Sequence, residues 1–539
     1  MPILLKEISR SADPRVRSFL VGVAVTVSGD QETLARLAKM ALSEIANPDV
    51  PEQERSYLRY GLVRLGKPAA RAVLELLTRR TSRHGPELIR LLDVLCAEGG
   101  VSEGIINEGA RFLLETLRAA DRETRRLVMD ARLCADPRVD EGLRVSLAAE
   151  LLANLVEYPA RDTAETICNS LEGIGPIALR PLFEFLQRRY PHEETEWAFV
   201  SIGRIVRSSG QEAPPELMHE ILEFCGALFD DPDAPVPAFT LAVAYLCGYT
   251  QEGARRFDEF LQTMQERLGK TAYTCELFEA LVVMAGSDNA RPRHQRELFE
   301  VFDRVANTRA PRQLGITRQT QEGTVYEFGR EVLFDTRIVP AVVRGLENIC
   351  VSRAAPPELS KDIVKRLLIL WEGVSHARLV WGPGGVGALI HALCAAGCSD
   401  RVTVQVRVRL GHSLLRSLKR VAVVRAVGDI CGRAARGSEF RDLCLRTAEM
   451  MLTEWEGSDK QDDERRLALL VSLGKIAANT VLKAGDPAVE RTRENVLQAL
   501  FVALRGGITG VREPLTMLQE CECLPEERRA EIRERLSRA

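Results

Sequence analysis

The sequence lacks several features that define common protein classes. No apolar run approaches the roughly 18 consecutive residues that a membrane-spanning helix needs. Aromatic residues make up only 5% of the chain and strand-like alternation is nearly absent, which argues against a mainly β protein. The net charge of -3 excludes a general nucleic-acid coat, and the 45% hydrophobic content excludes a disordered chain.

The cysteines form no dense disulfide framework. There are 13, an odd number, and most lie inside apolar helical patterns, as Cys96, Cys168 and Cys225 do. This usage predicts a reducing compartment, and we expect a cytoplasmic protein. An alternative is a signal peptide with residues 19–27, FLVGVAVTV, as its core. The acidic Asp13 and the missing small-x-small cleavage site favour a buried helix instead.

Lysine is scarce as well. Only 10 of the 73 basic residues are Lys, and the rest are Arg. Because the arginines are spread over the whole chain, we interpret the excess as a coding bias and not as a binding signal.

What the sequence does contain is helical periodicity from end to end. Apolar residues recur three and four positions apart, for example at Leu147, Leu151 and Leu155, so they line one face of a helix. Short stretches with Gly, Pro, Asn or Ser separate these segments. Helices of about 12 to 18 residues joined by short loops therefore fill most of the chain, and we predict an all-α protein.

Three segments resemble one another internally. They are residues 65–77 (LGKPAARAVLELL), 174–186 (IGPIALRPLFEFL) and 381–393 (WGPGGVGALIHAL). In each, a Gly ends one helix, a Pro opens the next, and apolar anchors follow. A second recurring signal is Asp-Pro before a helix, as in Asp136-Pro137 and Asp486-Pro487, where Asp can cap the N-terminus.

These motifs resemble the HEAT-repeat family, which is armadillo-like in architecture. The resemblance implies an α-solenoid of stacked antiparallel helical hairpins, wound into a superhelix. A single hairpin cannot bury its apolar stripe alone, so each repeat must lean on its neighbours. The charged C-terminal segment from Pro525, with Ile532 and Leu536 on one side, suits a terminal capping helix.

One stretch interrupts the pattern. Between residues 307 and 336 the periodicity fades, four Arg precede or enter it, and Thr324 to Phe328 (TVYEF) indicates a short extended piece. We predict an N-terminal array over residues 1–306, an irregular insertion or connector over 307–336, and a C-terminal array with a capping helix over 337–539. The insertion is either a plain connector or a partner-contacting loop or β-hairpin.

Several apparent motifs do not support a reactive site. The run WGPGGVGAL has glycines at phosphate-loop spacing, but Ala388 and Leu389 stand where Lys and Ser or Thr are required. His219-Glu-x-x-Glu223 lacks the second His of a zinc helix. His391, Cys394 and Cys398 would share a helical face and could hold zinc, but their apolar surroundings favour core packing. Cys521 and Cys523 are too close and too isolated for a convincing site. We therefore predict no catalytic residue, no metal and no cofactor, with catalysis unsupported and not disproved.

The strongest functional hint is a basic tract. From Arg401 to Arg441 there are ten Lys or Arg and only two Asp or Glu. Helical spacing places Arg409, Arg416 and Arg420 on one face, opposite a buried stripe. (A strand over Val402 to Val408 is a disfavoured alternative.) The competing interpretation is that acidic residues of the next repeat neutralise these charges. The predicted partner-binding residues are Arg409, Arg416, Lys419, Arg420, Arg312 and Arg318.

We expect a non-enzymatic scaffold or adaptor that binds a protein partner, with an acidic one favoured, along a solenoid surface. The first alternative is a nucleic-acid-binding array that grips phosphates through the tract from Arg401 to Arg441. The second, less favoured, is a HEAT-like lyase or glycosylase. No membrane association is expected, and the sequence leaves the oligomeric state open.

Overall fold

The structure is a computed structural model of all 539 residues. It describes residues 31–45, 50–78, 85–98, 100–231, 236–268, 274–307, 317–320, 323–328, 331–332, 338–375, 383–433, 437–458, 462–479, 482, 485–508 and 510–538. The chain divides into two compact units, Met1–Arg256 and Phe257–Ala539. The segment at residues 19–27 lies outside the described residues, and the predicted division into arrays around residues 307–336 remains a prediction.

The first unit is helical throughout its described residues. Its α-helices are α3 (Gln31–Ile45), α4 (Glu52–Leu65), α5 (Lys67–Thr78), α6 (Gly85–Ala97), α7 (Glu103–Ala119), α8 (Arg122–Met129), α9 (Glu141–Glu157), α10 (Arg161–Ile174), α11 (Leu179–Arg189), α12 (Thr195–Ser209), α13 (Pro215–Asp230) and α14 (Val236–Tyr249). Short 3₁₀ turns cover Arg132–Ala135, Gly175–Ala178 and Gly210–Glu212. Helix α15 (Gln251–Arg267) begins in this unit and ends in the next.

The second unit continues the same design. Its helices are α16 (Thr274–Gly286), α17 (Pro292–Asn307), α18 (Ile338–Val351), α19 (Pro357–Ser375), α20 (Pro383–Cys398), α21 (Val404–Leu415), α22 (Val421–Gly432), α23 (Ser438–Glu456), α24 (Asp463–Ala477), α25 (Pro487–Arg505), α26 (Arg512–Glu520) and α27 (Glu526–Arg538). Between α17 and α18 lie three short strands, β1 (Thr317–Thr320), β2 (Gly323–Phe328) and β3 (Glu331–Val332).

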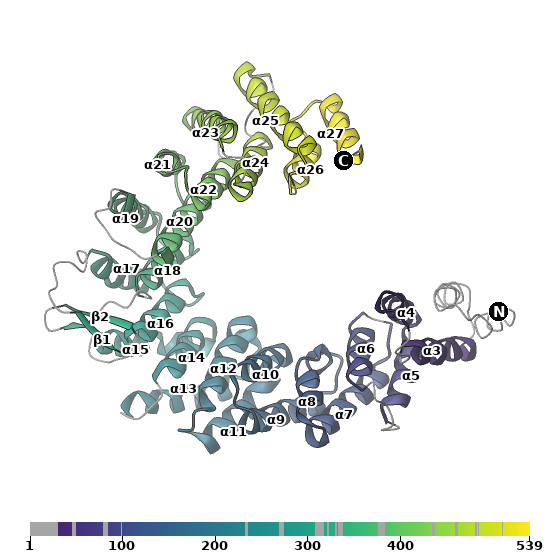
Figure 1. The fold of residues 1–539 in the computed structure, drawn as a ribbon. Helices are drawn as coiled ribbons and strands as arrows, with labels where there is room; N and C mark the ends of the chain where they lie inside the picture. The colour runs from purple at the N-terminus through teal and green to yellow at the C-terminus, as the bar shows by residue number, and fades with distance from the viewer. Residues whose placement is uncertain are drawn as a thin grey trace. The chain divides into compact units, whose positions relative to one another are not determined.

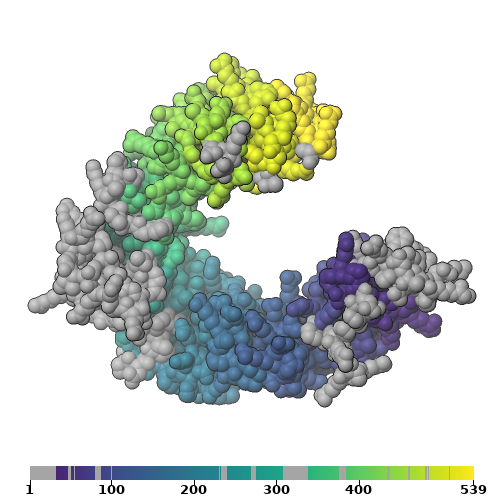
Figure 2. All heavy atoms as spheres, in the orientation of Figure 1, coloured from purple at the N-terminus to yellow at the C-terminus, as the bar shows by residue number. Residues whose placement is uncertain are grey.

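Packing follows the order of the chain, as the ribbon in Figure 1 shows. Within each unit, most helices contact the next helix in the chain, the one after it, or both, so two layers form. In the second unit, α16, α18, α20, α22, α24 and α26 pack in succession, and α17, α19, α21, α23 and α25 form the other layer. Side chains fill the space between successive helices of each unit (Figure 2). This arrangement confirms the predicted all-α solenoid of stacked helical hairpins.

The core is the apolar stripe that the periodicity predicts. The equivalent anchors Val73, Leu182 and Leu389 of the three similar segments are all fully buried. At two of the segments the Gly takes a positive φ, +57° at Gly66 and +79° at Gly175, and there it ends helices α4 and α10. Such backbone favours a residue without Cβ, which explains the Gly in the repeated motif.

The prediction that the Asp of an Asp-Pro pair caps the following helix holds at one described position and fails at another. Asp486 caps α25, because its carboxylate accepts the Ala488 N–H at 3.0 Å and Pro487 occupies the first turn. The prediction was wrong at Asp136, whose carboxylate instead accepts hydrogen bonds from Arg138. Asp140, four residues later, caps α9. The arginine two positions after Asp136 competes successfully for the carboxylate that would otherwise cap the helix.

Arginine has a structural role that the sequence analysis missed. Five guanidinium groups donate hydrogen bonds to backbone carbonyls at or just beyond the C-terminal ends of helices, where carbonyls lack intrahelical partners. They are Arg138 to Cys96 at the end of α6, Arg125 to Ala120 after α7, Arg401 to Arg353 and Ala355 after α18, Arg407 to Ser399 after α20, and Arg493 to Ala477 and neighbours after α24. Part of the arginine excess therefore joins successive repeats, which corrects its interpretation as coding bias alone.

The extended piece within residues 307–336 is confirmed. Strand β2 pairs antiparallel with β1, with Tyr326 opposite Thr317, and its end pairs with β3. The helices on either side, α17 and α18, pack against each other. The strands thus project from a continuous pair of helices.

A helix follows Pro525, as expected, and its predicted capping role remains a prediction. Helix α27 packs on α26 and buries Ile532, while most of its other residues are exposed or half-buried. Just before it, Cys521 and Cys523 form a disulfide, which the sequence analysis did not expect. Among the residues that the structure describes, no helix is long and apolar enough to cross a bilayer.

Candidate functional site

The basic tract folds into two helices and a tight turn. Helix α21 ends at Leu415, and Arg416 is its C-terminal cap. A turn covers residues 416–420, and Arg420 is the N-terminal cap of α22. The predicted helix over Val404 is confirmed, and the alternative strand is not formed.

The predicted common helical face is wrong in part. Arg409 lies within α21, but that helix stops before Lys419 and Arg420, so these residues do not continue its face. The reason is that Leu418 is buried, at 4% exposure, and turns the chain back toward the core. The turn nevertheless places three basic residues within five positions, and all of them are exposed.

The tract separates into neutralised and unneutralised charges. Arg425 pairs with Glu464 at 3.0 Å, and Arg441 pairs with Asp486 at 2.6 Å, as the competing interpretation expected. Arg401 and Arg407 bind the carbonyls described above. Arg433 caps the end of α22 and interacts with the Cys398 thiol, and Arg436 lies outside the described residues. Four further side chains are exposed and make no ion pair with any residue that the structure describes; we call them the basic turn: Arg409, Arg416, Lys419 and Arg420.

The basic turn carries a concentrated positive charge. Of the two acidic residues of the tract, Asp429 pairs with Lys475 at 2.5 Å, and Glu439, at the start of α23, makes no ion pair with a residue that the structure describes. The cations Lys419 and Arg420 also lie at the N-terminal end of α22, where the helix dipole adds further positive potential. The turn is therefore suited to an anionic partner.

Arg312 lies outside the described residues, and Arg318 lies in β1 with a side chain whose placement is not described. Their predicted role in partner binding remains a prediction.

Two arginines of α21, two residues apart, provide a test of the distinction between arginines with internal partners and exposed arginines. Arg407 is buried, with 5% exposure, and donates to the Ser399 carbonyl at 2.8 Å, whereas Arg409 is exposed. We expect Arg407→Met to lower the free energy of unfolding by about 1–3 kcal/mol, because it removes the hydrogen bonds that the buried guanidinium donates to the Ser399 carbonyl and to Asp400. Arg409→Met is expected to change it by less than about 0.5 kcal/mol. Urea denaturation followed by circular dichroism compares the two, and equal losses would contradict the assignment.

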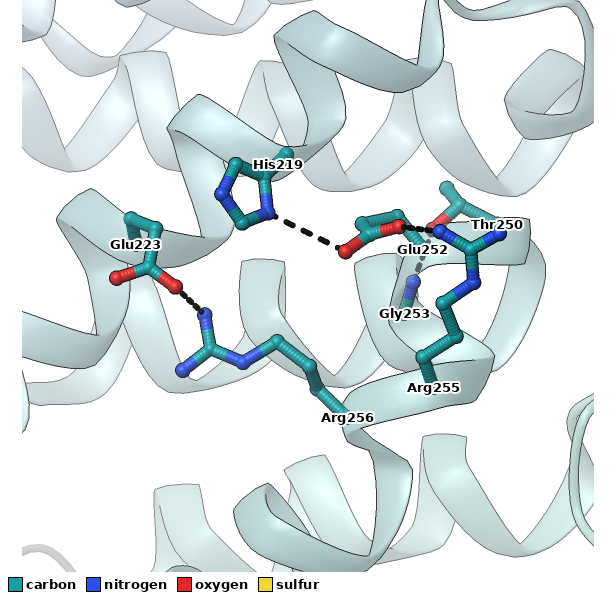
Figure 3. A network of polar contacts seen from close by, with 7 residues as sticks. All are labelled: His219, Glu223, Thr250, Glu252, Gly253, Arg255 and Arg256. Carbon is teal, nitrogen blue, oxygen red and sulfur yellow. Dashed lines mark hydrogen bonds and ion pairs between the residues drawn. The ribbon is translucent and has the colours of Figure 1, made fainter.

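The His219-Glu-x-x-Glu223 motif forms a structural network between α13 and α15 (Figure 3). His219 Nδ1 lies 3.2 Å from Glu252 Oε1, and Arg256 donates to Glu223 at 2.8 Å. Glu252 also accepts from Arg255 at 2.6 Å. Glu220 of the motif pairs instead with Arg180 of α11, at 2.8 Å. All three charged side chains of the motif thus have partners on neighbouring helices, which agrees with the interpretation of a solvated helix face.

The three residues considered as zinc ligands, His391, Cys394 and Cys398, do not converge on one point. His391 points to Glu347, with 3.0 Å between Nδ1 and the carboxylate, while Cys394 and Cys398 contact each other. The hydrogen bond between the two thiols raises the pKa of Cys394 and lowers the pKa of Cys398. Within the described part of the chain, no three His, Cys, Asp or Glu side chains gather in a way that suits a metal ion. Of the run WGPGGVGAL, residues 383–389 form the first two turns of α20.

Comparison with known proteins gives similarity at the level of structure only. No family model matches the chain, and no curated protein matches its sequence. A chain from the structure of Kap95p with RanGDP is 11% identical, with a TM-score of 0.47, and the match covers 99% of this chain and 67% of that one. Kap121p bound to Nup53p is 12% identical, with a TM-score of 0.40 and coverage of 96% and 51%. A chain from a study of cadherin and β-catenin is 13% identical, with a TM-score of 0.29 and coverage of 95% and 100%.

The present chain spans about half the length of the Kap121p chain that it matches. The evidence for its own fold is the layered helix packing described above.

Proposed function

We propose that this chain is a scaffold or adaptor that binds an acidic segment of a protein partner at the basic turn. The observation that carries the proposal is the group of four exposed cations that no described acidic residue neutralises. Four other arginines of the tract already have partners, and three of the four cations of the basic turn lie within residues 416–420. A partner carboxylate that binds there replaces only water, and no internal ion pair has to break.

The composition of the turn favours a protein partner over a nucleic acid. Single-stranded nucleic acids are held by aromatic side chains that stack on the bases as well as by cations. The only Phe, Tyr or Trp between Arg401 and Arg441 is Phe440, which is 1% exposed. The net charge of -3 also disfavours a long phosphate backbone running over the rest of the surface.

The test compares charge reversal at the turn with the same reversal elsewhere. The first variant carries Glu at Arg409, Arg416, Lys419 and Arg420. The control carries Glu at four other exposed arginines, so that its net charge is identical: Arg90, Arg111, Arg505 and Arg512. The probes are a fluorescein-labelled ten-residue poly-glutamate peptide and a labelled DNA oligonucleotide of the same charge, and anisotropy measures binding.

We expect the turn variant to bind the acidic peptide about 10–100-fold more weakly than the wild type, because each exposed charge pair contributes about 0.2–1 kcal/mol. The control variant should lose less than about threefold. Equal losses in both variants would show non-specific attraction and contradict the proposal. Tighter binding of the oligonucleotide than of the peptide would favour the nucleic-acid alternative.

A further inference from the structure

A groove lies between α23 and α25, helices of the same layer in the second unit, about 880 Å³ in volume. This size is within the range of pockets that hold small ligands and short peptides. Its lining includes apolar side chains of both helices, among them Leu452 and Trp455 on α23 and Ala499 and Val502 on α25. Val502 is 47% exposed, an unusual exposure for a large aliphatic side chain of this chain. The groove thus has an apolar strip that no described residue covers.

The charged groups of the groove are divided between its ends. Both helices belong to one layer of stacked hairpins, so they run in the same direction, and the lining runs from Leu445 and Ala488 at one end to Glu456 and Val502 at the other. Arg446 and Arg491 lie near the first end, and Glu456 lies at the other, with Glu449 between. All four are exposed, and none makes an ion pair with a residue that the structure describes.

The length of the groove and the separation of its charges suit an extended occupant. The lining of α23 runs from Leu445 to Glu456, which at 1.5 Å per residue is about 16 Å. An extended peptide of five residues has the same length at about 3.3 Å per residue, so its first and last side chains reach the opposite charges at the two ends. A helical segment is the alternative occupant, and the experiment below includes it.

A polar group beside the strip suits a peptide backbone. Asn495 is exposed on the wall, and its amide offers both a donor and an acceptor. A peptide carbonyl or N–H that reaches this amide would gain a hydrogen bond, which a purely apolar ligand would not.

We propose that this groove binds an extended protein segment of about five residues, with an acidic side chain at the Arg446 and Arg491 end, an apolar side chain in the middle and a basic side chain at Glu456. The opposite charges select the direction of the segment, and the apolar contact with Leu452, Trp455 and Val502 holds its centre. This inference shares with the proposed function only the assumption that the partner is a protein. The groove and the basic turn are separate surfaces.

The experiment uses the full chain and two acetylated, amidated peptides, Asp-Ala-Leu-Ala-Lys and its reversed order Lys-Ala-Leu-Ala-Asp. Tryptophan fluorescence reports binding, with Trp455→Phe as the variant that identifies the responding residue among the four Trp of the chain. We expect one of the two orders to bind, and Arg491→Glu to weaken its binding at least tenfold. Arg512→Glu, an exposed arginine of α26 outside the groove, is the matched control and should leave the affinity unchanged.

Exchanging the charges of Glu456 and of its peptide partner distinguishes a loss of specific binding from a loss of folded protein. The variant Glu456→Lys should bind the original peptide more weakly. It should bind more tightly the peptide in which Glu replaces Lys. The variant with four glutamates at the basic turn should bind the preferred peptide normally, so the two proposals fail independently. The inference is overturned if neither peptide binds up to about 1 mM. It is also overturned if charge reversal at Arg491 and Glu456 changes nothing, or if a stapled helical peptide of the same composition binds more tightly.

Discussion

Replacing Arg493 with Met is expected to lower the local free energy of unfolding around α24 to α26 by about 3–5 kcal/mol. The side chain is buried, with 4% exposure, and its guanidinium donates to the carbonyls of Ala477 at 3.0 Å, Leu482 at 2.7 Å and Asn479 at 3.3 Å. Burial lowers the pKa of the group, and the nearby Glu490 carboxylate opposes this shift. Met fills much of the volume but donates no hydrogen bond, and among the described residues only the Asn479 carbonyl of these three keeps a backbone donor, the Leu482 N–H at 3.2 Å.

Arg505→Met is the matched control, because Arg505 lies on the same helix and is exposed. It should cost less than about 1 kcal/mol, the usual contribution of a cation near a helix C-terminus. Hydrogen–deuterium exchange measures both variants, since in a repeat array each helix depends mainly on its neighbours. The exchange of α24 and α26 should accelerate in the Arg493 variant only. Unchanged exchange there would contradict the role assigned to the arginine.

Gly253→Ala is expected to be the second strongly destabilising change, with a loss of about 3 kcal/mol at the corner between α14 and α15. A Cβ at this position would lie 2.0 Å from the Leu246 carbonyl oxygen and 2.5 Å from the Cys247 Cα, so backbone must move. The same corner is joined by Thr250, which accepts the Gly253 N–H at 2.9 Å and donates to the Leu246 carbonyl at 2.8 Å (Figure 3).

The control for this substitution is Gly61→Ala in α4. A Cβ there would meet no atom within 4 Å, and Ala is the better helix former by about 1 kcal/mol. The control should therefore be neutral or stabilising, whereas the variant at Gly253 should lower the first transition seen in thermal unfolding. If both variants behave alike, the close approach of α14 and α15 is not a property of the molecule in solution.

The sequence predicted the architecture well because helix periodicity and turn chemistry are local. The spacing of Leu147, Leu151 and Leu155 places them on one face, and all three are at most 1% exposed. The Gly at positions 66 and 175 could be assigned to helix ends from its freedom to take a positive φ. The terminal helix followed from its charge and from Ile532.

The candidate site was predicted only as a region, because the pairing of charges depends on tertiary contacts. From spacing alone, Arg407 and Arg409 are equivalent, yet one reaches the Ser399 carbonyl and the other faces solvent. Periodicity also continued α21 through residue 420, whereas the buried Leu418 reverses the chain. The partners of Arg493 come from the ends of α24 and the turn before α27, so no local pattern identifies them.

The groove between α23 and α25 was likewise invisible in the sequence. Its lining joins residues more than 40 positions apart, such as Leu445 and Ala488, and the amphipathic patterns of the two helices are ordinary. A signal exists only in retrospect, in the exposed Val502.

Hydrogen–deuterium exchange of the full chain with and without the acidic poly-glutamate peptide tests the central claim most directly. The account predicts slower exchange of backbone amides in the turn at residues 416–420 and in the first turn of α22, where the bound carboxylates would lie. The groove between α23 and α25 should show no change with this peptide. Absence of protection at the turn, or stronger protection on another helix, would contradict the assignment of the basic turn as the docking surface.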